Sequence, residues 1–409
     1  MKTRLISLPY LGFSEIEADV VIKESLRFSR LAANKLTLRA LHKMPPKQGY
    51  IDHFGVHRPR NNAGDTVLFD VLQKLLSSHF GPLSFRNSAL RAKVTDQDVA
   101  RINAAAQAVL VGGGGLLIED SNPNAESGWQ WRISEDHLAR IDKPLILFAI
   151  GYNLFRTDKP PSQRMVDHVE KTMDKSVFFG MRNHGSIERT KAMIAQELHH
   201  KIIFQPCMTT FLTEYHPSLK TKSGADGREK RIALNLAFDR AERRFGDQAD
   251  AVLERIGGAV DHLIQQGWQV DLTLHGWDDE PAIAYFRKRG SAVNPVYLNL
   301  CTPDEVVEYY ADVPLTFGMR GHAQMIPFGC GNPIFSLISH DKLGFFLDDI
   351  GHREWGADIF DADLGDKIVD FARLAHESHA DLKTKISKAK AKLWAQTQTN
   401  LKTLPLTGT

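Results

Sequence analysis

The sequence predicts an α/β protein with two Rossmann-like domains in tandem, facing each other across a cleft. Short apolar runs typical of buried parallel strands alternate with helical segments in both halves of the chain. A polar segment rich in turn formers separates the two halves. The chain has 409 residues, which favours two domains because single cores rarely exceed about 250–300 residues.

The first half is expected to contain five strands. These run from Tyr50 to Phe54, Ala108 to Val111, Leu145 to Ile150, Val177 to Phe179 and Ile202 to Gln205. Asp65 stands where the N-cap of a helix belongs, before the apolar run that begins at Thr66. A second helix is expected from Pro161 to Met173. Helical spacing is also present from Ser14 to Leu41, before a break at Pro45-Pro46.

The strand pattern restarts after residues 213–230, which we interpret as an interdomain linker. The second set of strands is expected at Ile232 to Phe238, Val270 to His275, Val296 to Leu300, Leu315 to Met319 and Ile334 to Ile338. Thr302, followed by Pro303 and two acids, predicts a helix that runs to about Tyr310. The predicted domains are therefore 1–212 and 231–380. Ligands of parallel sheets bind at the carboxyl ends of the strands, so the cleft between the domains is the expected site.

Residues 381–409 are expected to form a basic helix and a tail. An apolar stripe of Leu382, Ile386, Ala389 and Leu393 is surrounded by five lysines. A helix that packs on the body of the protein explains this pattern. The alternative is a helix that makes peripheral contact with the inner face of the plasma membrane.

The composition restricts the class of protein. A net charge of +2 gives no argument for a nucleic-acid partner. Cys207, Cys301 and Cys330 form no CxxC pair, which favours a reducing compartment and argues against a zinc site or disulfides. The N-terminal apolar run is interrupted by Pro9 and Glu15, unlike a signal peptide, and no segment approaches the ~20 apolar residues of a membrane span. We therefore expect a cytoplasmic location.

Four consecutive glycines, 112–115, directly follow a predicted strand. Glycine lets the backbone approach a ligand, and its N–H groups can face an anion. A tight turn is the alternative, but four glycines exceed what a turn needs. We expect a ligand near Gly113, Gly114 and Gly115. Asp120 belongs either to this site or to a solvated loop.

Charged residues lie where several predicted strands end. Asp65 is either only a helix cap or a carboxylate that addresses an acceptor hydroxyl. Arg182 and Arg320 each follow a strand, one in each half, and could clamp a carboxylate or phosphate between them. His322 is either structural or a proton carrier. Lys342 is either solvated or placed to hold an anion at a helix N-terminus.

Taken in order, these motifs resemble the signatures of the polysaccharide pyruvyl transferase family, from about residue 50 to about residue 352. The segments that carry the resemblance are Asn62-Ala63-Gly64-Asp65, Val109 to Gly115, Leu147 to Gly151, Arg182 to Ser186, Arg320-Gly321-His322-Ala323, Gly331-Asn332-Pro333 and Lys342. The chain departs from the family pattern at Asn183, where aspartate is usual. It departs again at Gln205-Pro206-Cys207, where an Asp-Pro pair is common.

The resemblance implies a GT-B-like fold and a transferase. The reaction would move pyruvate from phosphoenolpyruvate onto a hydroxyl pair of a sugar and form a ketal. It would serve the synthesis of capsule, exopolysaccharide or cell-wall polymer. The arginines that match Arg182 and Arg320 are linked to donor binding in the family, and the histidine that matches His322 is linked to catalysis. The implied partners are phosphoenolpyruvate, as co-substrate, and a sugar or lipid-linked oligosaccharide acceptor, with no cofactor and no metal.

The chemistry of this reaction suits the residues. It needs a proton donor for carbon, a base for the hydroxyl and cations on the leaving phosphate. We interpret His322 as the residue that moves the proton, with Arg182, Arg320 and Lys342 on the donor. Asp65 or the glycine loop, with Asn62, would address the acceptor.

Two other functions stay open at this point. A GT-B glycosyltransferase that uses a nucleotide sugar would have the same fold. A non-catalytic scaffold of a polysaccharide assembly complex, held at the membrane by the basic helix, is the second.

Overall fold

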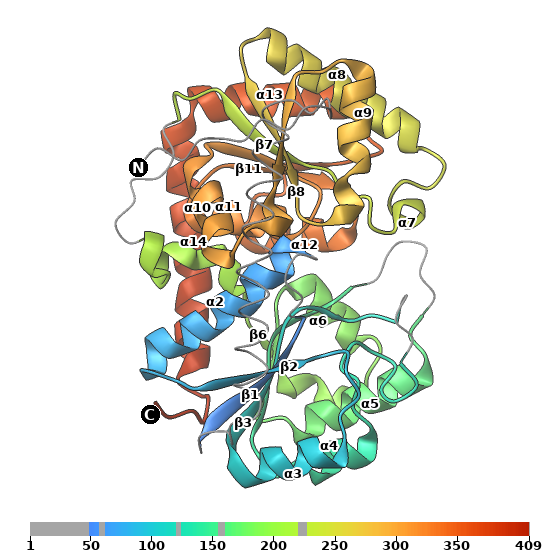
Figure 1. Cartoon of the computed structure of the whole chain (residues 1–409), viewed down its shortest axis with the longest axis vertical. Helices are drawn as coiled ribbons and strands as arrows, with labels where there is room; N and C mark the ends of the chain where they lie inside the picture. Colours follow the sequence, from blue (N-terminus) through green and yellow to red (C-terminus); the bar gives the residue numbers. More distant parts are fainter. Residues whose placement is uncertain (1–48, 57–61, 120–123, 154–159, 220–226, 409) are drawn as a thin grey trace, which may run out of the picture. The chain divides into compact units, whose positions relative to one another are not determined.

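Two parallel sheets form the framework of the protein (Figure 1). The computed structural model describes residues 49–56, 62–119, 124–153, 160–219 and 227–408. The helical spacing from Ser14 to Leu41 and the candidate Asp120 therefore lie outside the described residues. Each sheet has six strands, and every pair of neighbouring strands is parallel. The α/β fold class predicted from the sequence is confirmed.

The first sheet has the strand order β2-β1-β3-β4-β5-β6. Its strands are β1 (Tyr50–Gly55), β2 (Phe85–Ala89), β3 (Ala106–Leu117), β4 (Leu145–Tyr152), β5 (Phe178–Met181) and β6 (Ile202–Phe204). The accompanying helices are α2 (Ala63–Phe80), α3 (Asp96–Ala105), α4 (Glu135–Arg140), α5 (Gln163–Lys175), α6 (His184–Lys191) and the 3₁₀ helix η1 (Gln196–Lys201). Successive residues of β4, such as Leu147 and Phe148, belong to two different apolar cores, so both faces of the sheet are covered.

The second sheet has the strand order β12-β11-β10-β7-β8-β9. Its strands are β7 (Arg231–Asn235), β8 (Gln269–Leu274), β9 (Val293–Tyr297), β10 (Leu315–Gly318), β11 (Ile334–Ile338) and β12 (Gly356–Asp358). Its helices are α7 (Ala241–Phe245), α8 (Ala249–Gln265), α9 (Pro281–Arg289), α10 (Pro303–Asp312), α11 (His322–Cys330), α12 (Asp341–Ile350) and α13 (Leu364–Glu377), with 3₁₀ turns η4 (Trp277–Asp279) and η5 (Leu298–Leu300). Thr302 caps α10 in a capping box with Glu305, which confirms the predicted helix start.

One apolar core continues from the first sheet into the second. It contains Val67 and Leu72 of α2, Phe211 of the 3₁₀ helix η2 (Met208–Glu214), and Phe317 of β10. The backbone N–H of Ala63 also donates a 2.7 Å hydrogen bond to the carbonyl of His275, at the end of β8. Residues 48–409 accordingly form one compact unit. The domain boundaries drawn from the sequence stay a prediction.

Two strands were missing from the sequence prediction. Strand β2 reads FRNSA and is partly exposed at the edge of its sheet, so it lacks the apolar run that marks a buried strand. Strand β12 has three residues. The predicted strand from Val296 to Leu300 is also displaced, because β9 ends at Tyr297 and Leu298–Leu300 form a 3₁₀ turn.

Two local predictions at the site were wrong. The strand predicted to end at Val111 does not end before the glycines at 112–115, since β3 runs on to Leu117 and pairs with β4 at Gly112 and Gly114. Asp65 is not the N-cap of α2. Asn62 has that role, and its side chain accepts hydrogen bonds from the backbone N–H groups of Gly64 and Asp65 at 2.9 and 3.4 Å. The Asp65 carboxylate is therefore not used as a cap.

The C-terminal helix α14 (His379–Leu401) buries its apolar stripe, as the packed alternative expects. Lys390 is buried with it and donates to Thr213. Further along, Asn400 donates to the carbonyl of Phe204 at 2.8 Å. Lys385, Lys388 and Lys392 are exposed, and contact of this face with a membrane stays a prediction. No helix in the described part of the chain has the length and apolar character needed to cross a bilayer.

Candidate functional site

A polar cavity of about 130 Å³ lies where the carboxyl ends of the strands of both sheets meet. Nine of the ten residues selected from the sequence line it: Asn62, Asp65, Gly113, Gly114, Gly115, Arg182, Arg320, His322 and Lys342. The tenth, Asp120, lies outside the described residues. Residues far apart in the sequence are brought together here because they lie near the carboxyl ends of strands or at the starts of helices.

Arg182 follows β5 and is buried, with 7% of its surface exposed. Its Nε and Nη2 atoms are buried and have no hydrogen-bond partner. Burial lowers the pKa of Arg182, partly offset by Cys207 and Asp65. Gly151 makes room for the side chain, because a Cβ at this position would lie 2.3 Å from Arg182 Nε. A buried guanidinium with unused donors is the arrangement expected for an anion site.

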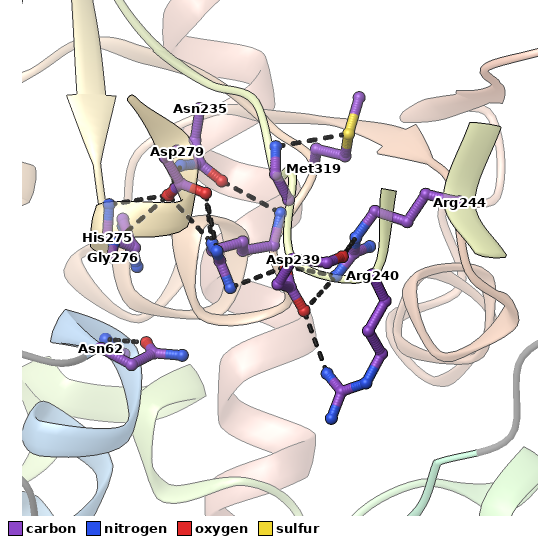
Figure 2. A network of polar contacts seen from close by, with 12 residues as sticks. Asn62, Asn235, Asp239, Arg240, Arg244, His275, Gly276, Asp279 and Met319 are labelled. Atoms are coloured by element: carbon purple, nitrogen blue, oxygen red, sulfur yellow. Dashed lines mark hydrogen bonds and ion pairs between the residues drawn. The ribbon is translucent and has the colours of Figure 1, made fainter. Parts of the chain in front are cut away.

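Arg320 is held by two carboxylates, as the network in Figure 2 shows around Asp239 and Asp279. Its Nε and Nη2 donate to Asp279 at 2.6–3.1 Å, and its Nη1 lies 3.0 Å from Asp239 Oδ1. Burial lowers the pKa of Arg320, but the two aspartates outweigh burial and the pKa is raised overall. The guanidinium is thus fixed in position at the cavity wall, with part of its charge already neutralised.

Asp279 is in turn held by the backbone. The N–H groups of His275 and Gly276 donate to its Oδ2 at 3.0 and 3.3 Å, and Asn235 Oδ1 accepts from the N–H of Arg320 at 3.1 Å (Figure 2). These bonds tie the ends of β7, β8 and β10 together. The second sheet therefore presents a rigid wall to the cavity.

His322 is the first residue of α11 and is 9% exposed. Burial lowers its pKa well below the ordinary histidine value, and Arg182, Lys342 and His275 lower it further. Its Nε2 lies 3.9 Å from Cys207 Sγ. A Cβ on Gly64 would lie 2.6 Å from the Cβ of His322, so the first turn of α2 packs directly on this histidine. Burial and these basic neighbours thus favour the neutral form of the imidazole.

The pKa of Asp65, in the first turn of α2, is shifted in the opposite direction. Burial raises the pKa of its carboxyl group, while Arg91, Arg320, Lys342 and Arg182 act to lower it. The site thus holds a carboxyl group that retains its proton more readily than usual and an imidazole that loses its proton more readily. Opposed shifts of this kind mark acid and base pairs in active sites.

Further cations in the cavity were not selected from the sequence. Arg91 follows strand β2, which was not predicted from the sequence. Arg240 and Arg244 follow the predicted strand that ended at Phe238, so a signal for them was present. Burial and the nearby Arg244, Arg243 and Arg91 lower the pKa of Arg240 to about 10. Burial also lowers the pKa of Lys342 far below its ordinary value, with Arg182 and Arg244 acting in the same direction.

Arg240 has a left-handed backbone, with φ of 55°. This conformation is uncommon outside glycine and costs free energy, and such residues cluster at functional sites. In Figure 2 its guanidinium points away from Arg244, with its Nη1 3.1 Å from Asp239 Oδ2.

The first sheet also contributes backbone and an amide side chain to the cavity lining. Gly114 has a φ of 116°, which other residues rarely adopt. Asn153, which follows β4, is 8% exposed and its Oδ1 has no hydrogen-bond partner. A Cβ on Gly115 would lie 3.0 Å from its Cγ. An amide oxygen of this kind suits a ligand hydroxyl.

One group of potential metal ligands exists in the described residues, formed by Asp70, His216 and Asp304 outside the cavity. Lys74 Nζ lies 2.8 Å from Asp70, 2.5 Å from Asp304 and 3.3 Å from His216 Nε2. The lysine therefore supplies the positive charge that these groups need.

Solved structures with a similar fold include MnaA of S. aureus in a co-structure with UDP. It is 12% identical to this chain, with a TM-score of 0.50, and the match covers 88% of this chain and 99% of that one. The UDP-GlcNAc 2-epimerase from Neisseria meningitidis bound to UDP-GlcNAc is also 12% identical, covering 87% and 100%, with a TM-score of 0.49. At this identity the likeness to MnaA shows the fold alone, which is GT-B-like as predicted. No curated protein matches the chain.

The family model of polysaccharide pyruvyl transferases matches residues 62–341, more than half of the chain. The match begins at the cap of α2 and ends in the segment that carries Lys342 into the cavity. It therefore spans the elements from both sheets that build the site. The chain belongs to the polysaccharide pyruvyl transferase family, a family of transferases.

Proposed function

We propose that this enzyme transfers pyruvate from phosphoenolpyruvate to two hydroxyl groups of a sugar in surface polysaccharide biosynthesis. The observation that carries the proposal is Arg182, a buried guanidinium with unpaired N–H groups in the cavity of a family member. Such a group calls for an anionic oxygen ligand. Family membership supports phosphoenolpyruvate as that ligand, and the charge of the cavity is in keeping with it.

The charge in the cavity suits a small, highly charged anion. Six cationic side chains line it: Arg91, Arg182, Arg240, Arg244, Arg320 and Lys342. Three carboxylates oppose them: Asp65, Asp239 and Asp279. The basic side chains outnumber the carboxylates, which suits phosphoenolpyruvate, whose carboxylate adds one negative charge to the about 1.5–2 of a phosphate monoester. A cavity of about 130 Å³ suits a small molecule of this size.

The opposed pKa shifts of Asp65 and His322 suggest their roles. The acid, Asp65, gives a proton to the methylene carbon, which makes C2 electrophilic. The base, His322, accepts the proton of the first acceptor hydroxyl as its oxygen bonds to C2. The C2–O bond to phosphate then breaks, and Arg182, Arg240 and Arg244 stabilise the departing charge. The second hydroxyl adds to C2 and closes the ketal, and its proton leaves with phosphate.

This assignment differs from the interpretation drawn from the sequence. There, His322 moved the proton and Asp65 addressed the acceptor. In the proposal, Asp65 acts on the donor carbon, and Asn153 with the glycines of β3 faces the acceptor hydroxyls. Arg320 holds its position through Asp239 and Asp279 and offers its remaining donors to the phosphate. The reaction as written uses no cofactor other than the co-substrate, and the acceptor is a sugar or a lipid-linked oligosaccharide.

The proposal is tested by the shift in melting temperature that ligands cause. Phosphoenolpyruvate at ~100 times its dissociation constant should stabilise the folded chain by about 2.7 kcal/mol. Its shift should exceed that of inorganic phosphate, because phosphate lacks the carboxylate. Arg182→Ala should strongly reduce the shift with both ligands, because Arg182 holds the phosphate that they share.

Arg373→Ala is the matched control, since Arg373 is an exposed arginine of α13 that pairs with Asp370. It should keep the full response. A shift with UDP-GlcNAc and none with phosphoenolpyruvate would instead favour the nucleotide-sugar glycosyltransferase. A phosphoenolpyruvate response that persists in Arg182→Ala would refute the role of this arginine.

A further inference from the structure

A second, open groove lies beside the cavity, on the second sheet. It has a volume of about 770 Å³, within the range of about 300–1,000 Å³ that is usual for ligand sites. Residues from three segments line it, among them Phe238, Trp277, Asp278, Glu280, Arg287 and Tyr297. No part of the chemistry proposed above uses these side chains.

Trp277 dominates the groove. It is 44% exposed and is the one aromatic among the strongly exposed large hydrophobic side chains of the described residues. Its ring centroid lies 6.3 Å from that of Tyr297, with an angle of 50° between the rings. The two rings together form an apolar surface in the groove. Exposed aromatic surface of this kind indicates a binding site.

Polar groups around the rings define the chemistry of the ligand. Asp278 and Glu280 are exposed carboxylates, and Arg287 is an exposed guanidinium in α9. Carboxylates accept hydrogen bonds from hydroxyls, and arginine donates to ring and hydroxyl oxygens. Acidic groups disfavour nucleic acid and anionic lipid. Flat aromatic faces combined with hydroxyl-binding groups suit a sugar, which has apolar C–H faces and a rim of hydroxyls.

Two loops link the groove to the cavity, because neighbouring residues of each loop face one or the other. Phe238 and Ala241 line the groove and flank Asp239 and Arg240, which line the cavity. In the other loop, Trp277 faces the groove while Asp279 of the same 3₁₀ turn pairs with Arg320. The cavity, with a volume of about 130 Å³, suits the donor and the reacting groups. A longer acceptor must therefore continue outside it.

We propose that this groove is an acceptor subsite, which binds the sugar units next to the one that receives pyruvate. Trp277 and Tyr297 stack on a sugar face, and Asp278 and Glu280 bind its hydroxyls. This inference rests on the proposed function, because the site of pyruvate transfer in the cavity fixes where the neighbouring sugar units lie. It predicts that the enzyme prefers an oligosaccharide to a single sugar.

The test uses the full chain, labelled with a fluorophore, on an array of defined oligosaccharides from disaccharides upward. The wild-type protein should bind a subset of the array, and Trp277→Ala should reduce this signal at least tenfold. Trp277→Phe keeps an aromatic face and should retain most of it. Leu374→Ala is the matched control, because Leu374 of α13 is 43% exposed and lies outside the groove. Circular dichroism of each variant excludes misfolding.

Each result is decisive. Binding that is lost in Trp277→Ala and kept in the other two variants supports the subsite. A wild-type protein that binds no saccharide, or a Trp277→Ala protein that binds the same saccharides equally well, overturns it. The melting shift of the wild type with phosphoenolpyruvate is measured in parallel. If that shift is absent while Trp277-dependent saccharide binding persists, phosphoenolpyruvate is refuted as the donor, and the saccharide groove is still supported.

Discussion

At the scale of single residues, the site is defined by how burial and neighbouring charges change ordinary side chains. The pKa of His322 is lowered because burial and three nearby basic groups oppose its protonation. Asp65 is shifted towards its protonated form because burial outweighs four cations. Neither shift is visible in the sequence, since burial arises from elements more than a hundred residues apart. The residue types alone suggested proton transfer but not its direction.

His322→Gln and Asp65→Asn should each lower kcat by about 10²- to 10⁴-fold, the usual loss for a general acid or base. A pH profile separates the two roles. Protonation of His322 causes loss of activity on the acid side, and deprotonation of Asp65 causes loss on the alkaline side. His322→Gln should therefore lose the acid limb, and Asp65→Asn the alkaline limb. Unchanged limbs in both variants would contradict the assignment.

At the scale of elements, neighbouring strand ends position the charged side chains. Arg182 at the end of β5 lies against Gly151 near the end of β4, and His322 at the start of α11 lies against Gly64 in α2. The sequence shows these glycines within family-like motifs, but it does not show which side chain each one accommodates. Asn183, in contrast, is a departure from the family pattern whose local role the structure shows. It caps α6 by accepting from Ser186 N–H at 2.7 Å, a role that the aspartate usual in the family would fill equally well.

Gly151→Ala tests this packing. The added Cβ would lie 2.3 Å from Arg182 Nε, so the guanidinium must move and the melting shift with phosphoenolpyruvate should fall to that of Arg182→Ala. Gly258→Ala in α8 is the control, because its Cβ meets only Arg289 Nη2 at 3.9 Å. That variant should keep the full melting shift with phosphoenolpyruvate. Its free energy of unfolding should rise by up to about 1 kcal/mol, because alanine has a higher helix propensity than glycine. A full ligand response in Gly151→Ala would contradict the packing argument.

At the scale of the whole molecule, one of the two apolar cores of the described residues holds side chains from both sheets. Helix α2 begins at the cavity and buries Val67, Leu68 and Leu72 in an apolar cluster that also holds residues of the second sheet. Lys74 of the same helix pairs with Asp304 of α10. The wall of the cavity and the contact between the sheets are thus made by the same helix. Substrate binding and global stability should be coupled through it.

We expect the two sheets to unfold together. Hydrogen exchange measured against denaturant should show β4 and β11 losing protection at the same midpoint, as in a cooperative two-state unit. Leu72→Ala, which removes a fully buried side chain of α2, should lower both midpoints, at a cost of about 2–5 kcal/mol. Two separate midpoints, or a loss confined to one sheet, would show that the sheets are independent.

Local patterns in the sequence were sufficient to predict the fold class, most strands of both sheets, the start of α10 and nine of the residues that line the cavity. Each of these depends on an apolar run, a cap or a strand end, which are short-range features of the chain. The neutralisation of Arg320 by Asp239 and Asp279, the unpaired donors of Arg182, and the cations Arg91, Arg240 and Arg244 depend on contacts between distant segments. The groove around Trp277 also exists only after packing, because surface exposure is a property of the folded chain and not of its composition.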